Sequence, residues 1–138
     1  MNTPLLRISA AIADVLDVTP FSIRRRLKTS RVVLARHVVL YIARAELGMT
    51  YEEIGREMRR HNSSVLHGIN RVTTLIRQAD PLTLVAVQAG EQAAVEWRRL
   101  TPIAAMRERR ERIRERAREM LAEADRIGVE LGQLGAAE

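Results

Sequence analysis

Polar side chains with hydrogen-bonding groups recur at helical spacing between residues 64 and 74. They are Ser64, His67, Asn70, Arg71 and Thr74. Residues three and four positions apart share one face of a helix. Imidazole, amide and hydroxyl groups on such a face can bond to base edges in the DNA major groove, which is wide enough for one helix. The spacing therefore predicts nucleic-acid binding by an exposed helix face.

A helix-turn-helix would present this polar face. Thr50 and Glu53 fit a capping box, in which the hydroxyl and the carboxylate each satisfy a backbone N–H at a helix start. Residues 59–62 contain no apolar residue and predict a tight turn, with Asn62 or Ser63 capping the next helix. The core side of that second helix is predicted from an apolar stripe, namely Val65, Ile69, Val72 and Ile76.

The remaining segments are also predicted to be helical, so the expected fold class is all-α. The pairs Thr19-Pro20, Asp80-Pro81 and Thr101-Pro102 each indicate a helix start, because proline at the first helical position loses no hydrogen bond. No hairpin turn or sustained alternation predicts a strand. We expect a small helix-turn-helix bundle followed by a C-terminal helical extension with a long coiled-coil-like helix. The further helices are expected at about 5–16, from 20 onward, 31–47, 81–100 and 102–134.

Two of these helices carry specific core predictions. Helix 31–47 is expected to bury Val32, Ala35, Val39, Ile42 and Ala43. Helix 81–100 is expected to turn inward Leu84, Val85, Ala89, Ala93 and Trp97. Gly90 is expected only to weaken this helix, because glycine is a poor helix former.

Positive charge is concentrated in the first part of the chain. The formal net charge is +6; residues 1–79 hold 13 Lys/Arg against 6 Asp/Glu, and residues 80–138 hold 10 against 11. This asymmetry predicts a polyanion-binding domain at 1–79 and an oligomerisation or partner-binding extension at 80–138. Helix capping and genome composition are the simpler explanations for some of these arginines. The densest basic cluster is Arg24, Arg25, Arg26 and Lys28.

Composition argues against several classes of protein. Cysteine is absent, which excludes disulfides and cysteine zinc sites. No signal peptide or membrane-length apolar run is present, so a cytoplasmic, nucleoid-associated protein is expected. His61 and His67 are six positions apart and do not form a metal-ligand pair on one helix face. No nucleophile has a partnered base, so we expect neither an enzyme nor a cofactor.

Five blocks of sequence follow one another along the chain, namely residues 13–19, 28–37, 41–47, 53–55 and 63–67. In this order they resemble the C-terminal DNA-binding domain of the bacterial chromosomal replication initiator DnaA. The similarity covers about residues 8–75, roughly half of the chain. It implies a helix-turn-helix fold with double-stranded DNA as partner. No Gly-x-x-x-x-Gly-Lys-Ser/Thr loop occurs, so we expect a stand-alone relative without the ATPase module or a nucleotide.

The resemblance also implies roles for individual residues. The turn is one residue shorter than in the family, with His61 at the family's Asp and Asn62 at its His. Asparagine pairs bidentately with adenine, so base contact is retained, although a different target sequence is expected. Lys28 occupies the position of the family's arginine that enters the minor groove. Base contacts are expected from His61, Asn62, Ser63, Ser64 and His67. Backbone or minor-groove contacts are expected from Arg24, Arg25, Lys28, Arg31, Arg36, Arg60, Asn70 and Arg71.

The last helix carries a seam typical of coiled coils. Its apolar residues follow a 3-4 spacing through ten positions, interrupted once by a charge: Ile103, Met106, Arg110, Ile113, Ala117, Met120, Ala124, Ile127, Leu131 and Leu134. We expect a homodimer through this helix. The alternative is that it folds back on helix 81–100 of the same chain.

Two rivals to specific DNA binding follow from the same residues. A helical adaptor would bind an acidic protein through its basic domain. RNA or non-specific nucleoid binding is the third possibility, and the low aromatic content of 3% argues against single-strand recognition, which uses stacking platforms.

Overall fold

The computed structural model describes residues 3–136, except for the side chains of residues 103–105, 107–108 and 136. Within this range the chain forms helices without strands, which confirms the all-α class. The helices are α1 (Pro4–Leu16), α2 (Pro20–Arg24), α3 (Ser30–Ala45), α4 (Tyr51–Met58), α5 (Asn62–Arg77), α6 (Pro81–Leu100) and α7 (Pro102–Ala136). The chain divides into two compact units, Met1–Arg99 and Leu100–Glu138.

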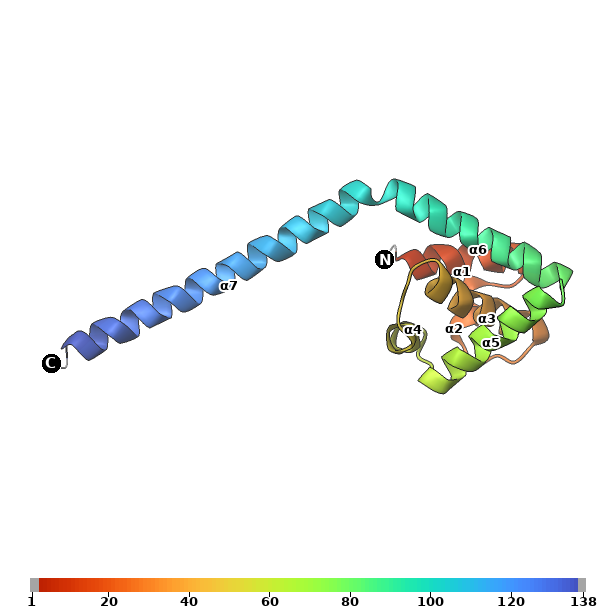
Figure 1. Cartoon of the computed structure of the whole chain (residues 1–138), viewed down its shortest axis with the longest axis horizontal. Helices are drawn as coiled ribbons and strands as arrows, with labels where there is room; N and C mark the ends of the chain where they lie inside the picture. Colours follow the sequence, from red (N-terminus) through yellow and green to blue (C-terminus); the bar gives the residue numbers. More distant parts are fainter. Residues whose placement is uncertain (1–2, 137–138) are drawn as a thin grey trace. The chain divides into compact units, whose positions relative to one another are not determined.

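Helix α3 is the central element of the first unit. It packs against α1, α2, α4 and α5, and these helices surround it in Figure 1. The five core positions predicted for this helix are all buried. Val38 and Leu40 are buried as well, so α3 contributes to the core on more than one side, as a central helix must.

Side-chain caps define where the helices begin. Thr19 Oγ1 accepts a hydrogen bond from Ser22 N at 3.2 Å. The capping box at Thr50 and Glu53 is present with both of its bonds. Asp80 caps α6, because the N–H of Thr83 donates to Asp80 Oδ2 at 3.0 Å. Each cap supplies an acceptor for a backbone N–H that has no partner within its helix.

The bonds from Thr83 also lower the pKa of Asp80. The hydroxyl of Thr83 contributes most, followed by its N–H, while Arg71 adds a smaller effect. A carboxylate with a depressed pKa stabilises the fold above its unfolded-state value and loses that contribution as the pH falls through the folded-state value. The α6 cap is therefore weakened by acid.

Helix α6 buries only part of the face predicted for it: Ala93 is buried and Ala89 and Trp97 are half-buried, but Leu84 and Val85 are not buried. Leu84 and Val85 are 41% and 49% exposed, and the buried residues are Thr83, Ala86, Val87, Gly90, Ala93 and Ala94. A Cβ at Gly90 would lie 2.7 Å from Ile42 Cγ1 and 3.2 Å from Ile12 Cδ1. Small residues are buried here because α6 lies close to the core, and Gly90 permits that approach. Consequently α6 packs as part of the first unit, which extends to Arg99.

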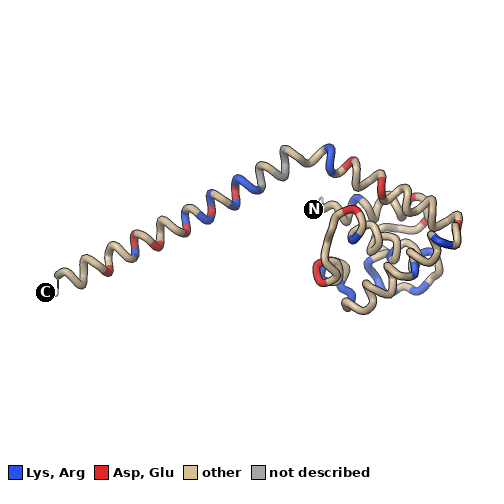
Figure 2. The backbone as a smooth tube through the Cα atoms, viewed as in Figure 1, with Lys and Arg blue, Asp and Glu red and all other residues tan. Residues whose placement is uncertain are grey.

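The second unit consists of one long helix. Every described side chain of α7 is exposed, and basic and acidic residues are interspersed along it (Figure 2). Glu111 pairs with Arg118 at 3.1 Å and with Arg114 at 3.9 Å, but exposed pairs of this kind contribute little stability. Within residues 3–136, no helix combines the length and apolar character that a bilayer span requires.

We predict that Gly90→Leu destabilises the first unit by about 1–3 kcal/mol or more, because overpacking a filled core forces backbone and rotamer shifts. The matched control is Gln92→Leu, an exposed position in the same helix. It should change the unfolding free energy by less than about 0.5 kcal/mol. Urea unfolding followed by circular dichroism measures both, and equal effects would contradict close packing at Gly90.

Candidate nucleic-acid interface

The turn between α4 and α5 is closed by backbone contacts. A Cβ at Gly55 would lie 2.5 Å from the carbonyl oxygen of Arg60, so a side chain there would displace the turn. The N–H of Arg60 donates to Gly55 O at 2.8 Å. Arg59 adopts a left-handed conformation with φ 53°. Arginine therefore occupies a conformation that favours glycine.

His61, rather than Asn62 or Ser63, caps α5. Its Nδ1 accepts the backbone N–H of Ser63 at 3.2 Å and lies 2.8 Å from Ser63 Oγ. Residue 61 has the extended backbone of a capping position, and Asn62 is the first residue of the helix. The predicted caps were wrong because an imidazole nitrogen can accept the same bond as a hydroxyl or amide oxygen. The Asn62 side chain is exposed and is not the cap of α5.

The polar face of α5 is exposed as the spacing predicted. Val65, Ile69 and Val72 are buried, and Ile76 packs at the edge of the core. The hydroxyl of Thr74 donates a hydrogen bond to the carbonyl oxygen of Asn70, in the same helix, at 3.0 Å. All five polar residues predicted from their spacing are exposed, namely Ser64, His67, Asn70, Arg71 and Thr74. The side chains of His61, Asn62 and Ser63, which precede them, are exposed as well.

Arg36 has a role different from the one predicted. Its side chain is only 8% exposed, and it donates to the carbonyl oxygens of Ile23 at 2.8 Å and Leu27 at 3.2 Å, with a longer contact to Ser22 O. It also donates to Arg25 O. Burial lowers the pKa of Arg36, with a further contribution from Arg60. The guanidinium therefore organises the segment after α2 instead of facing a phosphate.

Arg60 joins the same cluster from the helix-turn-helix side. Its Nη2 donates to Arg25 O at 2.8 Å, so one carbonyl oxygen accepts from two guanidinium groups. Its Nε is buried and has no hydrogen-bond partner among the described atoms. Arg60 thereby links the turn to the segment that carries Lys28.

Three adjoining grooves bring most of the predicted residues together. The first, about 320 Å³, lies between the segment after α2 and the start of α5, and its lining includes Lys28, Arg60, His61 and Ser64. The second, about 400 Å³, is lined by Arg36, His37, Leu40, Arg60, Ser63, Ser64 and His67. The third, about 540 Å³, includes Lys28, Arg31, His67 and Arg71 in its lining. Shared lining residues connect the three grooves into one surface.

His37 lies beneath this surface and faces the polar side of α5. Its ring meets His67 edge to face, with the centroids 6.0 Å apart. Burial, followed by the positive fields of His67, Arg36 and Arg71, lowers the pKa of His37. A histidine whose folded-state pKa is depressed costs stability as the pH falls below its ordinary value near 6.5, because the unfolded chain then binds the proton more readily. The imidazole of His37 is accordingly neutral at pH 7.

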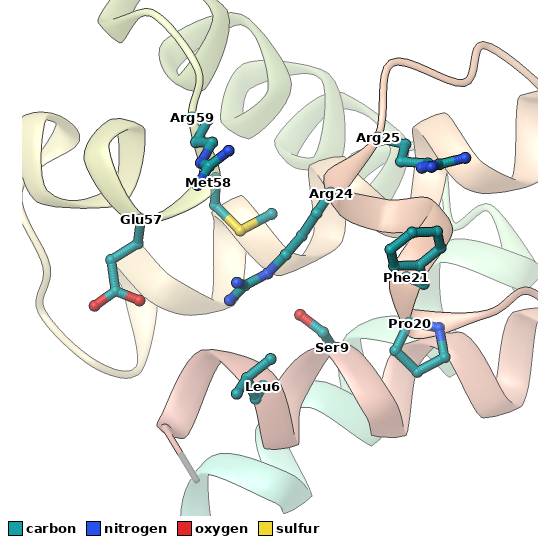
Figure 3. A pocket seen from close by; sticks show the side chains of 9 residues that line it. All are labelled: Leu6, Ser9, Pro20, Phe21, Arg24, Arg25, Glu57, Met58 and Arg59. Atoms are coloured by element: carbon teal, nitrogen blue, oxygen red, sulfur yellow. The ribbon is translucent and has the colours of Figure 1, made fainter. Parts of the chain in front are cut away.

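Arg24 and Arg25 lie apart from the three grooves. The guanidinium of Arg25 stacks over the ring of Phe21 at 4.4 Å. Arg24 extends across a separate cavity of about 450 Å³, between Met58 and Ser9 (Figure 3). The buried hydroxyl of Ser9 has no hydrogen-bond partner among the described atoms. In these conformations neither arginine lines the surface next to α5.

Two residues on or beside this surface, Arg59 and Leu66, were not predicted as site residues. Arg59 lines the first groove together with Arg26 of the basic cluster. Leu66 is 42% exposed on α5, four positions from both Asn62 and Asn70. Helical spacing alone could have identified Leu66, because it places this residue on the same face as those two asparagines. Among the residues with a described placement, no three His, Asp or Glu side chains gather as a metal ion would require.

The sequence of this chain is similar to one family of known proteins. Residues 6–72 match the family described as the bacterial dnaA protein helix-turn-helix. The chromosomal replication initiator protein DnaA of Streptococcus thermophilus is 32% identical over 82 residues, which is 59% of this chain and 18% of that protein. DnaA of Streptococcus pyogenes matches to the same extent.

The chain thus spans about a fifth of the length of these curated relatives. The matched region runs from α1 into α5. It includes the segment after α2 and the first part of α5, where the polar face and the basic residues meet. Residues 6–72 therefore form a helix-turn-helix domain similar to that of bacterial DnaA proteins.

Proposed function

We propose that the protein is a sequence-reading, double-stranded DNA-binding protein that acts in transcriptional control or at a replication origin. The observation that carries the proposal is the groove surface, where hydrogen-bonding residues of α5 adjoin the basic residues of the segment after α2. Base contacts give specificity, whereas phosphate contacts set position and most of the affinity. This surface offers both kinds of group. The proposed activity is binding, without catalysis.

Sequence reading is assigned to the first turn and outer face of α5. Asn62 is exposed at the helix start, and Ser63, Ser64 and His67 line the second groove. An asparagine can bond to both N6 and N7 of adenine. The exposed Leu66 suits contact with a thymine methyl group, which an apolar side chain recognises. Together these groups favour a site that contains A·T pairs.

Contact with the DNA backbone is assigned to basic residues that line the grooves. Lys28, Arg31 and Arg71 line the third groove, and Arg60 lines the first. Lys28 suits the minor groove less well than an arginine, because it lacks the planar guanidinium. Arg24, Arg25 and Asn70 are secondary candidates, since each is exposed but lines none of the three grooves.

The names of the relatives favour a role at a replication origin, because both are chromosomal replication initiators. A protein that controls transcription would need the same DNA-binding surface. We further propose that the protein is a homodimer through α7 and works on the nucleoid. A helical adaptor that binds an acidic protein is the alternative, and the salt dependence of DNA binding separates the two.

We predict that DNA affinity falls steeply with salt, since each phosphate contact contributes about 0.9 to the slope of log K against log salt concentration. Arg31→Ala should weaken binding to all duplexes about equally and reduce the slope by roughly one. Arg112→Ala in α7 removes the same charge outside the surface and should leave the slope unchanged. Fluorescence anisotropy at several salt concentrations measures both. A slope near zero for the intact protein would favour the adaptor.

We predict that Arg36→Lys lowers both the melting temperature and the DNA affinity, whereas Arg31→Lys largely preserves both. A lysine keeps the charge that a phosphate requires, but its ammonium group cannot bond in one plane to several carbonyl oxygens. Thermal melting and anisotropy on the same samples distinguish the two roles. If Arg36→Lys retained affinity and melting temperature, positioning by the guanidinium fork would be contradicted.

We predict that neighbouring substitutions at the start of α5 have separable effects. His61→Ala should lower the melting temperature, because the cap of the helix is lost. Asn62→Ala should leave the melting temperature unchanged and cost about 1–3 kcal/mol of preference at one base pair. Selection from a random duplex library, paired with thermal melting, measures the difference. An unaltered selected motif for Asn62→Ala would remove Asn62 from the base-contacting set.

A further inference from the structure

We propose that α7 pairs with α7 of a second copy in antiparallel orientation, so that one dimer holds its two DNA-binding units apart and binds two separated DNA sites. This inference rests on the proposed DNA-binding function and adds the geometry of the assembly to it. Its elements are the exposure of α7, the spacing of its apolar residues and the distribution of its charges.

Helix α7 has apolar side chains that its own unit does not cover. It runs for 35 residues, and its large apolar seam residues are between 49% and 72% exposed: Met106, Ile113, Met120, Ile127, Leu131 and Leu134. Isolated helices in water gain little stability from helix propensity and depend on packing of an apolar face. The part of this unit that the structure describes forms no second element to supply that packing, so a second helix must come from elsewhere.

The spacing of these residues favours a second helix of the same kind. With the first of each pair called a and the second d, position a holds residues 103, 110, 117, 124 and 131, and position d holds residues 106, 113, 120, 127 and 134. This heptad repeat is the sequence requirement of a coiled coil. Ile103 follows the pattern, although its side chain lies outside the described residues. Arg110 is the one charged member of the seam.

A parallel, in-register pair would set like charges together. Arg110 would face Arg110 of the second copy in the core layer. Flanking the seam, Arg109 at position g would face Arg114 at position e of the other helix, on both sides of the dimer. Charges at e and g choose partner and orientation in coiled coils, and like charges in contact are unfavourable. The parallel arrangement is therefore disfavoured.

An antiparallel pair replaces these repulsions with attractions. When a and d positions with numbers adding to 237 face each other, Arg110 meets Ile127 and Ala117 meets Met120. The flanking g positions then bring Arg109 beside Glu130 and Arg116 beside Glu123, and each pair occurs twice. Arg110 can extend its charged end past Ile127 to solvent, as long basic side chains do. All four flanking contacts are attractive, so charge complementarity selects a second, antiparallel copy.

The antiparallel arrangement separates the two DNA-binding units. Each first unit joins α7 at its N-terminal end, and antiparallel pairing places the two N-terminal ends at opposite ends of the coiled coil. At a rise of 1.5 Å per residue, 35 residues span roughly 50 Å. This separation exceeds the roughly 34–36 Å between half-sites one helical turn apart. The dimer is thus suited to two separated sites or two duplexes.

Disulfide cross-linking of the full chain tests the orientation without DNA. The natural sequence has no cysteine, so Arg110→Cys and Ile127→Cys each introduce one thiol. In the antiparallel dimer, neither variant alone cross-links, whereas a mixture of the two, one carrying a size tag, forms the mixed disulfide after subunit exchange. Homodisulfides of each single variant would instead establish the parallel form. A monomer by sedimentation equilibrium at tens of micromolar would overturn the pairing altogether.

Co-capture of DNA tests the consequence. A duplex selected by the protein is immobilised, and recovery of a second, fluorescent copy is measured. The intact protein should recover the second duplex. Ile127→Glu, which places a charge in the seam, should reduce that recovery at least tenfold while single-duplex binding persists.

The matched control is Ala122→Glu, which adds the same charge at position f on the outer face of α7 and should recover the second duplex normally. Recovery by Ile127→Glu equal to that of the intact protein would overturn bridging. So would failure of the intact, antiparallel dimer to recover a second duplex that it binds singly. If the intact protein bound no duplex at all, the proposed DNA-binding function would fail while the cross-linking result for α7 would stand.

Discussion

The binding surface depends on the hydrogen bonds that the buried guanidinium of Arg36 donates to backbone carbonyl oxygens. Helix α2 is only five residues long, so the chain that follows it has few backbone partners of its own. A buried carbonyl without a partner is costly, and Arg36 satisfies several of them at once. Arg60 reaches the same cluster at Arg25 O. One carbonyl oxygen therefore connects α3, the segment after α2 and the helix-turn-helix, and fixes the groove between Lys28 and His61.

The two units of the chain handle apolar surface in opposite ways. The first unit buries its apolar residues around α3 and leaves charge and hydrogen-bonding groups outside. The second unit contains α7, and every apolar side chain described in that helix is exposed. An apolar stripe of this length is stable in water only when something covers it. In the proposed function, DNA binding and assembly are therefore assigned to separate parts of the molecule.

The extent of the family match and the extent of the compact unit differ. The match ends at residue 72, within α5, whereas the first unit continues to Arg99. Helix α6 closes the core through Gly90 and the alanines around it, where its backbone approaches Ile42 and Ile12. The compact unit is accordingly larger than the part that matches the family, and α6 contributes packing to its core.

Sequence alone determined the helices, the capping box at Thr50 and the exposed polar face of α5, because each depends on spacing within one segment. Tertiary structure decided what depends on a neighbour. The arginine at position 36 resembles a phosphate-binding residue until the carbonyls around it are placed. Leu84 and Val85 are more apolar than Ala86 and Gly90, yet close approach to α3 favours the smaller side chains for burial. Hydrophobicity is a property of a residue, whereas the space available to it is set by the elements that surround it.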